Sequence, residues 1–231
     1  MSGKLTLLAS PLGNLGDVSE RFKRTVEECS LVFAEDSRVT GRLLDHLGLK
    51  RPQKTLNEHT AESGLQSYVK VIQAGEHAVL ITDAGTPGIS DPGARFVSMC
   101  VEEGIEVDAI PGPSAVTLAL SLSGFYAQRF AFLGYLPRKP GPMRAELGIF
   151  ANSPYSLVIF ESPFRIDALL QCAGEALGSR RVAICRELTK LHQQIVRTTL
   201  LSPPNVLEMP RKGEFTVVIE GYRKGTPAEN Q

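Results

Sequence analysis

Short apolar runs alternate with amphipathic segments through the first half of this chain. Runs at 5–9, 31–34, 79–81 and 107–110 have the length and composition of buried strands, and a weaker run lies near 54–56. Asp17 and Glu20 have capping-box spacing before a helical apolar face, and residues 61–74 and 94–103 follow the same helical spacing. This alternation predicts a largely parallel sheet that is covered by helices on both faces.

The pattern changes after about residue 112. It predicts a helix over 115–122, strands over 130–136, 156–160 and 181–185, a loop over 137–142 and a helix over 164–177. Two further strands, 193–200 and 214–220, have no amphipathic helix between them, which favours a mixed sheet. We therefore expect two α/β domains, at 1–112 and 113–225, followed by a frayed tail at 226–231.

Composition favours a compact enzyme of the cytoplasm. The 231 residues are 42% hydrophobic and carry no formal net charge. No apolar run approaches the length of a membrane span, and the first residues lack the order of a signal peptide. The four cysteines and four histidines lack metal-ligand spacing, so we expect free thiols and no metal.

Two loops rich in glycine and proline are the most informative segments. The segment 81–93 follows a predicted buried strand and holds three glycines and two prolines in its last eleven residues, and Pro111-Gly-Pro-Ser114 follows the next strand. Such loops lie at the carboxyl edge of a sheet, where open α/β folds bind ligands, and they let the main chain approach a ligand closely. We expect a paired ligand cleft there.

A dinucleotide-binding unit is the obvious alternative for the first turn. Residues 10–16 follow a strand, and Glu35 ends the next one, as the ribose-binding acid of such units does. The fingerprint G-x-G-x-x-G is absent, however, because only Gly13 and Gly16 are present. Pro11 also removes an N–H that a pyrophosphate would use.

Six motifs carry a resemblance to a known family. They are Ser-Pro-Leu-Gly-Asn-Leu at 10–15, Ala-Glu-Asp-Ser-Arg-Val-Thr-Gly at 34–41, Asp-Ala-Gly-Thr-Pro-Gly-Ile-Ser-Asp-Pro-Gly at 83–93, Pro-Gly-Pro-Ser-Ala at 111–115, Glu-Ser-Pro-Phe-Arg at 161–165 and Arg-Glu-Leu-Thr-Lys at 186–190. In this order they resemble the ribosomal RNA small subunit methyltransferase I family, a bacterial branch of the tetrapyrrole methylase superfamily.

The resemblance implies an enzyme that uses S-adenosylmethionine to methylate the ribose 2′-hydroxyl of a decoding-centre cytidine, cytidine 1402 of 16S rRNA. It also implies two α/β domains with the cofactor in the cleft between them, and a homodimer. The chain departs from the family pattern in three places: Ser10 replaces the usual Thr, Phe164 replaces the usual His, and 56–60 replaces a His/Asn-rich segment. Phe164 cannot transfer a proton.

By the same resemblance, residues from both domains surround the cofactor. The expected contacts are Leu12, Gly13, Asp83, Thr86, Pro87, Ile89, Ser114 and Ala115, with Phe160 and Cys185 reached from the second domain. Ser114 has a competing role as a helix N-cap, and Asp83 and above all Asp91 can instead brace their loop through bonds to its N–H groups.

Methyl transfer to a hydroxyl needs in-line positioning and an acceptor for the proton. The candidates are Glu161, Arg186, Glu187 and Lys190 in the second domain and Glu35, Asp36 and Arg38 in the first, where ion pairing is a competing role. Lys190 would be a base only with a lowered pKa, so phosphate binding is favoured for Lys190 and Arg186. No single base is chosen. Arg138, Lys139 and Arg144 are the expected contacts to RNA.

Two other functions stay open. One is a small-molecule C-methyltransferase of the same superfamily that acts on a porphyrin-like ring, and the other is a non-catalytic RNA-binding or assembly factor.

Overall fold

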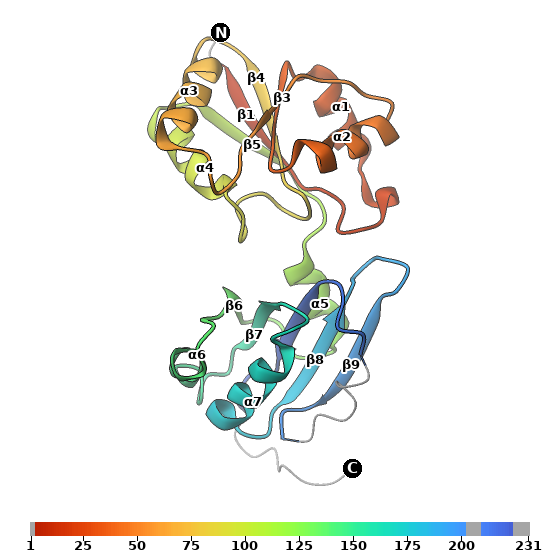
Figure 1. The fold of residues 1–231 in the computed structure, drawn as a ribbon, viewed down its shortest axis with the longest axis vertical. Helices are drawn as coiled ribbons and strands as arrows, with labels where there is room; N and C mark the ends of the chain where they lie inside the picture. The colour runs from red at the N-terminus through yellow and green to blue at the C-terminus, as the bar shows by residue number, and fades with distance from the viewer. Residues whose placement is uncertain (1–2, 202–208, 224–231) are drawn as a thin grey trace. The chain divides into compact units, whose positions relative to one another are not determined.

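The computed structural model describes residues 3–201 and 209–223, and the chain divides into two compact units, Met1–Ser114 and Ala115–Gln231. Each unit is an α/β sandwich with its own five-stranded sheet (Figure 1).

The first unit holds a fully parallel sheet. Its strands are β1 (Lys4–Leu8), β2 (Leu31–Ala34), β3 (Gln53–Thr55), β4 (His77–Ile81) and β5 (Glu106–Ile110), in the order β3-β2-β4-β1-β5. Its helices are the 3-10 turn η1 (Leu15–Asp17), α1 (Glu20–Glu28), α2 (Ser37–His46), α3 (Glu62–Gln73) and α4 (Gly93–Glu102). The parallel sheet that the alternating pattern predicted is confirmed.

Helices cover this sheet on both faces. Phe22 and Val26 of α1 and Leu43 of α2 pack against one face, which Val32 and Val79 present. The other face packs against α3 and α4 in a separate core, and the two helix pairs flank the sheet in Figure 1. Buried strands with both faces covered explain why the runs at 31–34 and 78–81 are apolar throughout.

The second unit has a mixed sheet. Its strands are β6 (Phe130–Tyr135), β7 (Ser156–Glu161), β8 (Arg181–Arg186), β9 (Gln194–Thr199) and β10 (Phe215–Ile219), in the order β6-β7-β10-β8-β9. Of the strand pairs in the described residues of this unit, β6 and β7 are parallel and the other three are antiparallel. The mixed sheet that the closing pair of strands predicted is confirmed.

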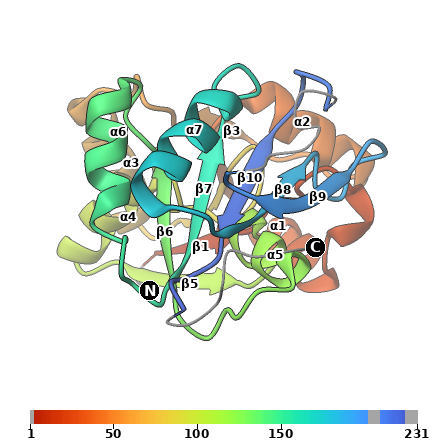
Figure 2. The same ribbon diagram turned by 90° about the horizontal axis from the view of Figure 1, so that it is seen from below.

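Among the described residues, three helices cover the second sheet. They are α5 (Ala115–Ser123), α6 (Pro140–Gly148) and α7 (Ile166–Leu177). Met143 and Leu147 of α6 share a core with α7, whereas α5 packs with Val158 and Ala183 on the other face. In Figure 2 α6 and α7 lie on one side of the strands and α5 on the other.

Two local predictions are wrong, and both concern helix starts. The cap of α1 is Ser19, whose Oγ accepts the Phe22 N–H at 3.1 Å, while Asp17 ends a separate 3-10 turn. Residues 137–142 are a loop only up to Lys139, because Pro140 occupies the first position of α6, where its missing N–H has no cost. Helix α2 was not predicted.

All four cysteines are buried free thiols, as the spacing predicted. Within the described residues no helix is long and apolar enough to cross a membrane.

Candidate functional site

The loop after β4 diverges from the loops of both neighbouring strands. The helix that follows β4 packs on one face of the sheet, whereas the helices that follow β1 and β2 pack on the opposite face. Open α/β sheets bind ligands outside the carboxyl ends of strands at such a divergence. The loops 9–16 and 82–93 therefore lie where the sequence predicted a ligand.

Backbone pairing makes these two loops rigid. Ser10 and Gly85 exchange N–H···O bonds of 2.9 and 3.0 Å, and the Ser10 hydroxyl donates to the Thr82 carbonyl at 2.7 Å. Gly85 has φ of 77°, which disfavours a side chain. A Cβ on Gly112 would lie 2.9 Å from the Ala9 Cβ, so glycine at this position allows the loop after β5 to approach the loop after β1.

The loop after β4 carries its own brace. The Asp91 carboxylate accepts the Ile89 N–H at 2.8 Å and the Gly93 N–H at 2.7 Å, so the bracing role predicted for Asp91 is confirmed. Thr86 donates to the Pro113 carbonyl at 3.1 Å, which ties this loop to the one after β5. Between these anchors Ile89 is 46% exposed, and a ligand can reach it.

Carboxylates of two neighbouring loops hold each other's backbone. Glu35 Oε2 accepts the Asp83 N–H at 3.1 Å, and Asp83 Oδ1 accepts the Asp36 N–H at 3.1 Å. Asp36 caps α2 and pairs with Arg38 at 2.6 Å, and the hydrogen bonds from Arg38 hold the pKa of Asp36 at about 2. Asp36 and Arg38 therefore neutralise each other's charge and form a structural ion pair.

Glu35 has a different electrostatic environment. Burial raises its pKa above the ordinary value, and the negative charges of Asp83, Asp91 and Asp36 raise it further, against the opposing hydrogen bond from the Asp83 N–H. The pKa of Asp83 is also raised, chiefly by burial. Glu35 is thus a carboxylate with increased affinity for a proton.

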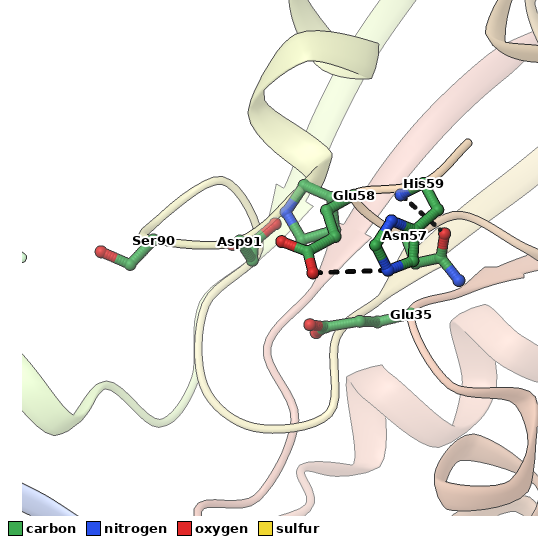
Figure 3. A pocket seen from close by; sticks show the side chains of 7 residues that line it. Glu35, Asn57, Glu58, His59, Ser90 and Asp91 are labelled. Carbon is green, nitrogen blue, oxygen red and sulfur yellow. Dashed lines mark hydrogen bonds and ion pairs between the residues drawn. The ribbon is translucent and has the colours of Figure 1, made fainter. Parts of the chain in front are cut away.

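A hollow of about 570 Å³ opens at the ends of β2, β3 and β4 (Figure 3). Its lining residues are Glu35, Asn57, Glu58, His59, Ser90, Asp91 and Pro92. Glu35, Glu58 and Asp91 come from three different loops, and the Ser90 hydroxyl points away from the other labelled groups. Asn57, Glu58 and His59 were not among the predicted site residues, although their polar run directly after a predicted strand was a usable signal.

The other predicted cofactor contacts of the first unit lie on the same loops. Leu12 is buried, and its Cδ2 would lie 3.4 Å from a Cβ on Gly85. Gly13 is exposed, Pro87 is buried, and Ser114 directly precedes α5. Ala115 is the first residue of α5.

Phe160 and Cys185 of the second unit lie on adjacent parts of one core. The Cys185 thiol is fully buried next to α5, and burial raises its pKa to about 11 despite the opposing charge of Arg197. The Phe160 ring contacts the rings of Phe132 and Tyr135, with centroids 4.8 and 5.9 Å apart.

The ends of β7, β8 and β10 meet at one edge of the second sheet. The register pairs Phe215, the first residue of β10, with both Glu161 and Arg186, which end β7 and β8. The Arg186 guanidinium is buried and donates to the Lys212 carbonyl at 2.7 Å and to the His192 carbonyl at 3.1 Å. This geometry favours a bracing role for Arg186.

Lys190 pairs with two carboxylates at this edge. Its Nζ lies 2.9 Å from Glu187 Oε1 and 3.0 Å from Glu214 Oε2. Burial acts to lower the pKa of Lys190, but the hydrogen bonds and charges of both glutamates outweigh it and raise the pKa. The pKa of Glu187 is lowered, because hydrogen bonds and the charge of Lys190 outweigh its burial. Lys190 is therefore a cation and a poor base.

Glu161 is the most buried carboxylate of the edge. Burial raises its pKa against the opposing effects of the Ser162 N–H bond and the Arg165 charge. Its Oε2 lies 3.2 Å from Arg165 Nη2, but the geometry does not make a hydrogen bond. Arg165 instead donates to the carbonyls of Leu136 and Pro137.

The predicted RNA contacts divide into two groups. Arg138 and Lys139 are exposed in the turn between β6 and α6, at the same edge as Lys190. Arg144 lies within α6 and pairs with Glu175 at 2.8 Å. Within residues 3–201 and 209–223 no three His, Cys, Asp or Glu residues are grouped so that they could hold a metal ion.

Comparison with known proteins gives one consistent family. Residues 4–203 match the model of tetrapyrrole (corrin/porphyrin) methylases. A ribosomal RNA small subunit methyltransferase I of Synechocystis sp. is 41% identical over 95% of this chain and 79% of its own length. A relative of the same name from Thermotoga maritima is 39% identical over 95% of this chain and 99% of its own.

Solved structures share the fold. The methyltransferase CobJ has a TM-score of 0.71 at 16% identity and covers 97% of this chain and 98% of its own. A uroporphyrin-III C-methyltransferase from Thermus thermophilus, solved with S-adenyl homocysteine, has a TM-score of 0.64 at 18% identity, over 94% of this chain and 97% of its own. The family match and the close relatives confirm the resemblance of the motifs: the chain belongs to the tetrapyrrole methylases, in the branch of the ribosomal RNA small subunit methyltransferases I.

Proposed function

We propose that this protein transfers the methyl group of S-adenosylmethionine to the 2′-hydroxyl of cytidine 1402 in 16S rRNA, as a homodimer. The observation that carries the proposal is a separation of charge between two sheet edges. The loops at the carboxyl edge of the first sheet form an acidic edge: 9–16, 35–38, 56–61, 82–93 and 111–114 together hold five carboxylates and one arginine.

The corresponding loops of the second sheet form a basic edge. Segments 136–139, 161–165, 186–193 and 210–214 hold seven lysines and arginines and three glutamates. S-adenosylmethionine is a net cation with one sulfonium, one ammonium and one carboxylate, and RNA is a polyanion. The acidic edge therefore suits the cofactor and the basic edge suits the acceptor.

The residues of the acidic edge fit S-adenosylmethionine as its binding site. The loop after β4 exposes Ile89, while Asp91 and Thr86 fix the shape of the loop. When bound there, the cofactor would supply an electrophilic methyl group. The fixed loops would orient it, and in-line positioning contributes much of the rate of such a transfer.

The proton of the attacking hydroxyl needs an acceptor, and the side chains of the site rank unequally for that task. Lys190 has a raised pKa, and Glu187 has a lowered one, so neither takes up a proton readily. Glu161 has a raised pKa, but its carboxylate is fully buried. Glu35 combines a raised pKa with a position on the wall of an open hollow, and we assign it as the acceptor of the hydroxyl proton.

The relatives support the acceptor. The Synechocystis and Thermotoga relatives, at 41% and 39% identity, are named for small-subunit ribosomal RNA, whereas the uroporphyrin-III C-methyltransferase is similar in fold at 18% identity. Incubation with radiolabelled S-adenosylmethionine tests this directly. Transfer to undermethylated small subunits supports the proposal, transfer to a tetrapyrrole precursor overturns it, and cofactor binding without transfer points to a non-catalytic factor.

The form of the acceptor is a separate expectation. A protein with few phosphate contacts should need the fixed backbone geometry of a folded ribonucleoprotein. Each contact contributes about 0.7 to 0.9 to the salt slope, so contacts from Arg138, Lys139 and Arg144 predict a shallow slope of about 2 to 3. Equal rates on assembled subunits and on a short oligomer, or a steep salt slope, would contradict this expectation.

A further inference from the structure

Three large apolar side chains are exposed on three loops of the basic edge. Tyr135 at the end of β6 is 62% exposed, Phe164 after β7 is 86% exposed, and Leu191 after β8 is 92% exposed. These three strands point in the same direction, so their carboxyl ends share one edge of the sheet. A single exposed apolar residue is ordinary, but a group of them at one edge indicates a binding surface.

Hydrogen bonds join the first two of these loops. The Arg165 guanidinium donates to the Leu136 carbonyl at 2.8 Å and to the Pro137 carbonyl at 3.3 Å, and thereby ties the Phe164 turn to the end of β6. The Phe164 N–H donates to the Ser162 hydroxyl at 3.3 Å within that turn. The Tyr135 ring packs against the Phe160 ring, with ring centroids 5.9 Å apart. The Tyr135 ring and the backbone of the Phe164 turn are therefore held before any partner arrives.

The Leu191 loop is held in an unusual backbone shape. Glu187 and Thr189 have positive φ angles of 52° and 66°, which few residues other than glycine adopt. Lys190 holds the loop to Glu187 and Glu214, and the Thr189 N–H donates to Gln193 Oε1 at 2.7 Å. These bonds maintain a conformation that presents Leu191 to solvent.

Tyr135 at the end of β6 and the loop that carries Leu191 lie near the same carboxylate. Partial burial raises the pKa of Tyr135, which is nevertheless 62% exposed, and the charges of Glu214 and Glu161 raise it further. Glu214 is also the carboxylate that holds Lys190, so Tyr135 and the Leu191 loop share one charged neighbour.

The surrounding charge identifies the occupant. Arg138, Lys139 and Lys212 are exposed on the same edge. Aromatic faces beside lysines and arginines are the features that bind unpaired bases of RNA, where the rings stack on the bases and the cations contact phosphates. We propose that Tyr135 and Phe164 form a stacking platform for the unpaired bases next to the methylated cytidine, and that Leu191 adds an apolar contact beside it. The platform rests on the proposed function, because it names how that site holds its RNA.

Substitutions at Phe164 separate stacking from simple apolar contact. Phe164→Ala and Phe164→Leu should both raise KM for undermethylated small subunits about tenfold, because leucine keeps the apolar bulk but loses the ring face. Phe164→Trp should restore the affinity. S-adenosylmethionine affinity, measured by calorimetry, should stay constant throughout. Ile149→Ala is the matched control: Ile149 is 76% exposed in the same unit but follows α6, at the opposite end of the sheet from the basic edge.

A binding measurement tests the platform without methyl transfer. An undermethylated small subunit whose 16S rRNA carries 2-aminopurine beside the target cytidine should lose fluorescence when the protein binds, since stacking quenches the base, and Phe164→Leu should abolish the quench. A leucine variant equal to wild type in both assays overturns the platform, and transfer by the wild type then leaves the proposed function intact. A dimer that dissociates on Phe164→Ala in sedimentation would also overturn it, because the patch would then be a contact between copies. Quenching that depends on Phe164, without any transfer to RNA, supports the platform and contradicts the proposed function.

Discussion

The two sheets end in edges of opposite character. The acidic edge of the first unit has five carboxylates and one arginine, and the basic edge of the second has seven lysines and arginines and three glutamates. The formal net charge of the whole chain is zero, so composition conceals this separation. The comparison teaches that a neutral protein can serve a polyanionic substrate when its charge is arranged by domain.

The edges also differ in how they are stabilised. The acidic edge is stabilised by hydrogen bonds of backbone groups: the Ser10 and Gly85 main chains pair, and the Asp91 carboxylate accepts two N–H groups of its own loop. The basic edge depends on long side chains, with Arg165 and Arg186 donating to carbonyls and Lys190 pairing with glutamates. A backbone edge suits close contact with a small ligand, whereas projecting side chains suit a large one.

The largest expected effect comes from placing a cation on the acidic edge. Ile89→Lys should weaken S-adenosylmethionine binding roughly a hundredfold or more, since juxtaposed like charges cost several kcal/mol and the longer side chain fills the approach to the loop. The melting temperature should change little, because Ile89 is partly exposed. Calorimetry measures both quantities, with Ile89→Leu as the control. Unchanged affinity in the lysine variant would place the cofactor elsewhere.

Loss of the proposed proton acceptor should come next. Glu35→Gln keeps an oxygen for the Asp83 N–H but cannot accept a proton, so kcat should fall about a hundredfold while cofactor affinity is retained. In the wild type the rate should rise with pH as Glu35 deprotonates, at a pKa above its ordinary value, and the variant should lose this dependence. A variant with the wild-type rate and pH profile would reduce Glu35 to a brace.

How well the sequence predicts a feature depends on how far apart in the chain its interacting residues lie. Strand positions and the Asp91 brace depend on neighbours within a few residues, and the local pattern predicted them. The parallel and mixed sheets followed from the order of strands and helices along the chain. The hollow beside Glu35 combines residues from positions 35, 57–59 and 90–92, and only the order β3-β2-β4 brings them together. The partners of Lys190 and Arg186 likewise include Glu214 and Lys212, more than twenty residues away.

A smaller effect is expected on the basic edge. Lys190→Ala should leave S-adenosylmethionine affinity unchanged and lower transfer to RNA about tenfold, as the loss of one charge-assisted contact would. Lys70→Ala, an exposed lysine in the last turn of α3, serves as the control. Wild-type turnover in Lys190→Ala would remove this residue from the acceptor side.

The smallest expected effect is on stability. The folded state raises the pKa of Glu161, so the folded protein holds a proton there that the unfolded chain releases, and stability falls as pH rises through the raised pKa. Glu161→Gln removes this dependence, so the variant should gain relative to wild type as pH rises above about 4.5. Urea unfolding across that window measures the difference. A difference independent of pH would contradict the raised pKa.

Hydrogen exchange with and without each ligand tests the separation of the two edges most directly. S-adenosylhomocysteine should slow exchange of the backbone amides in 82–93, and undermethylated small subunits added afterwards should slow exchange in 162–165 and 187–193. Protection of 82–93 by RNA alone, or protection by S-adenosylhomocysteine that leaves 82–93 unchanged, would contradict the assignment of cofactor and acceptor to opposite charges.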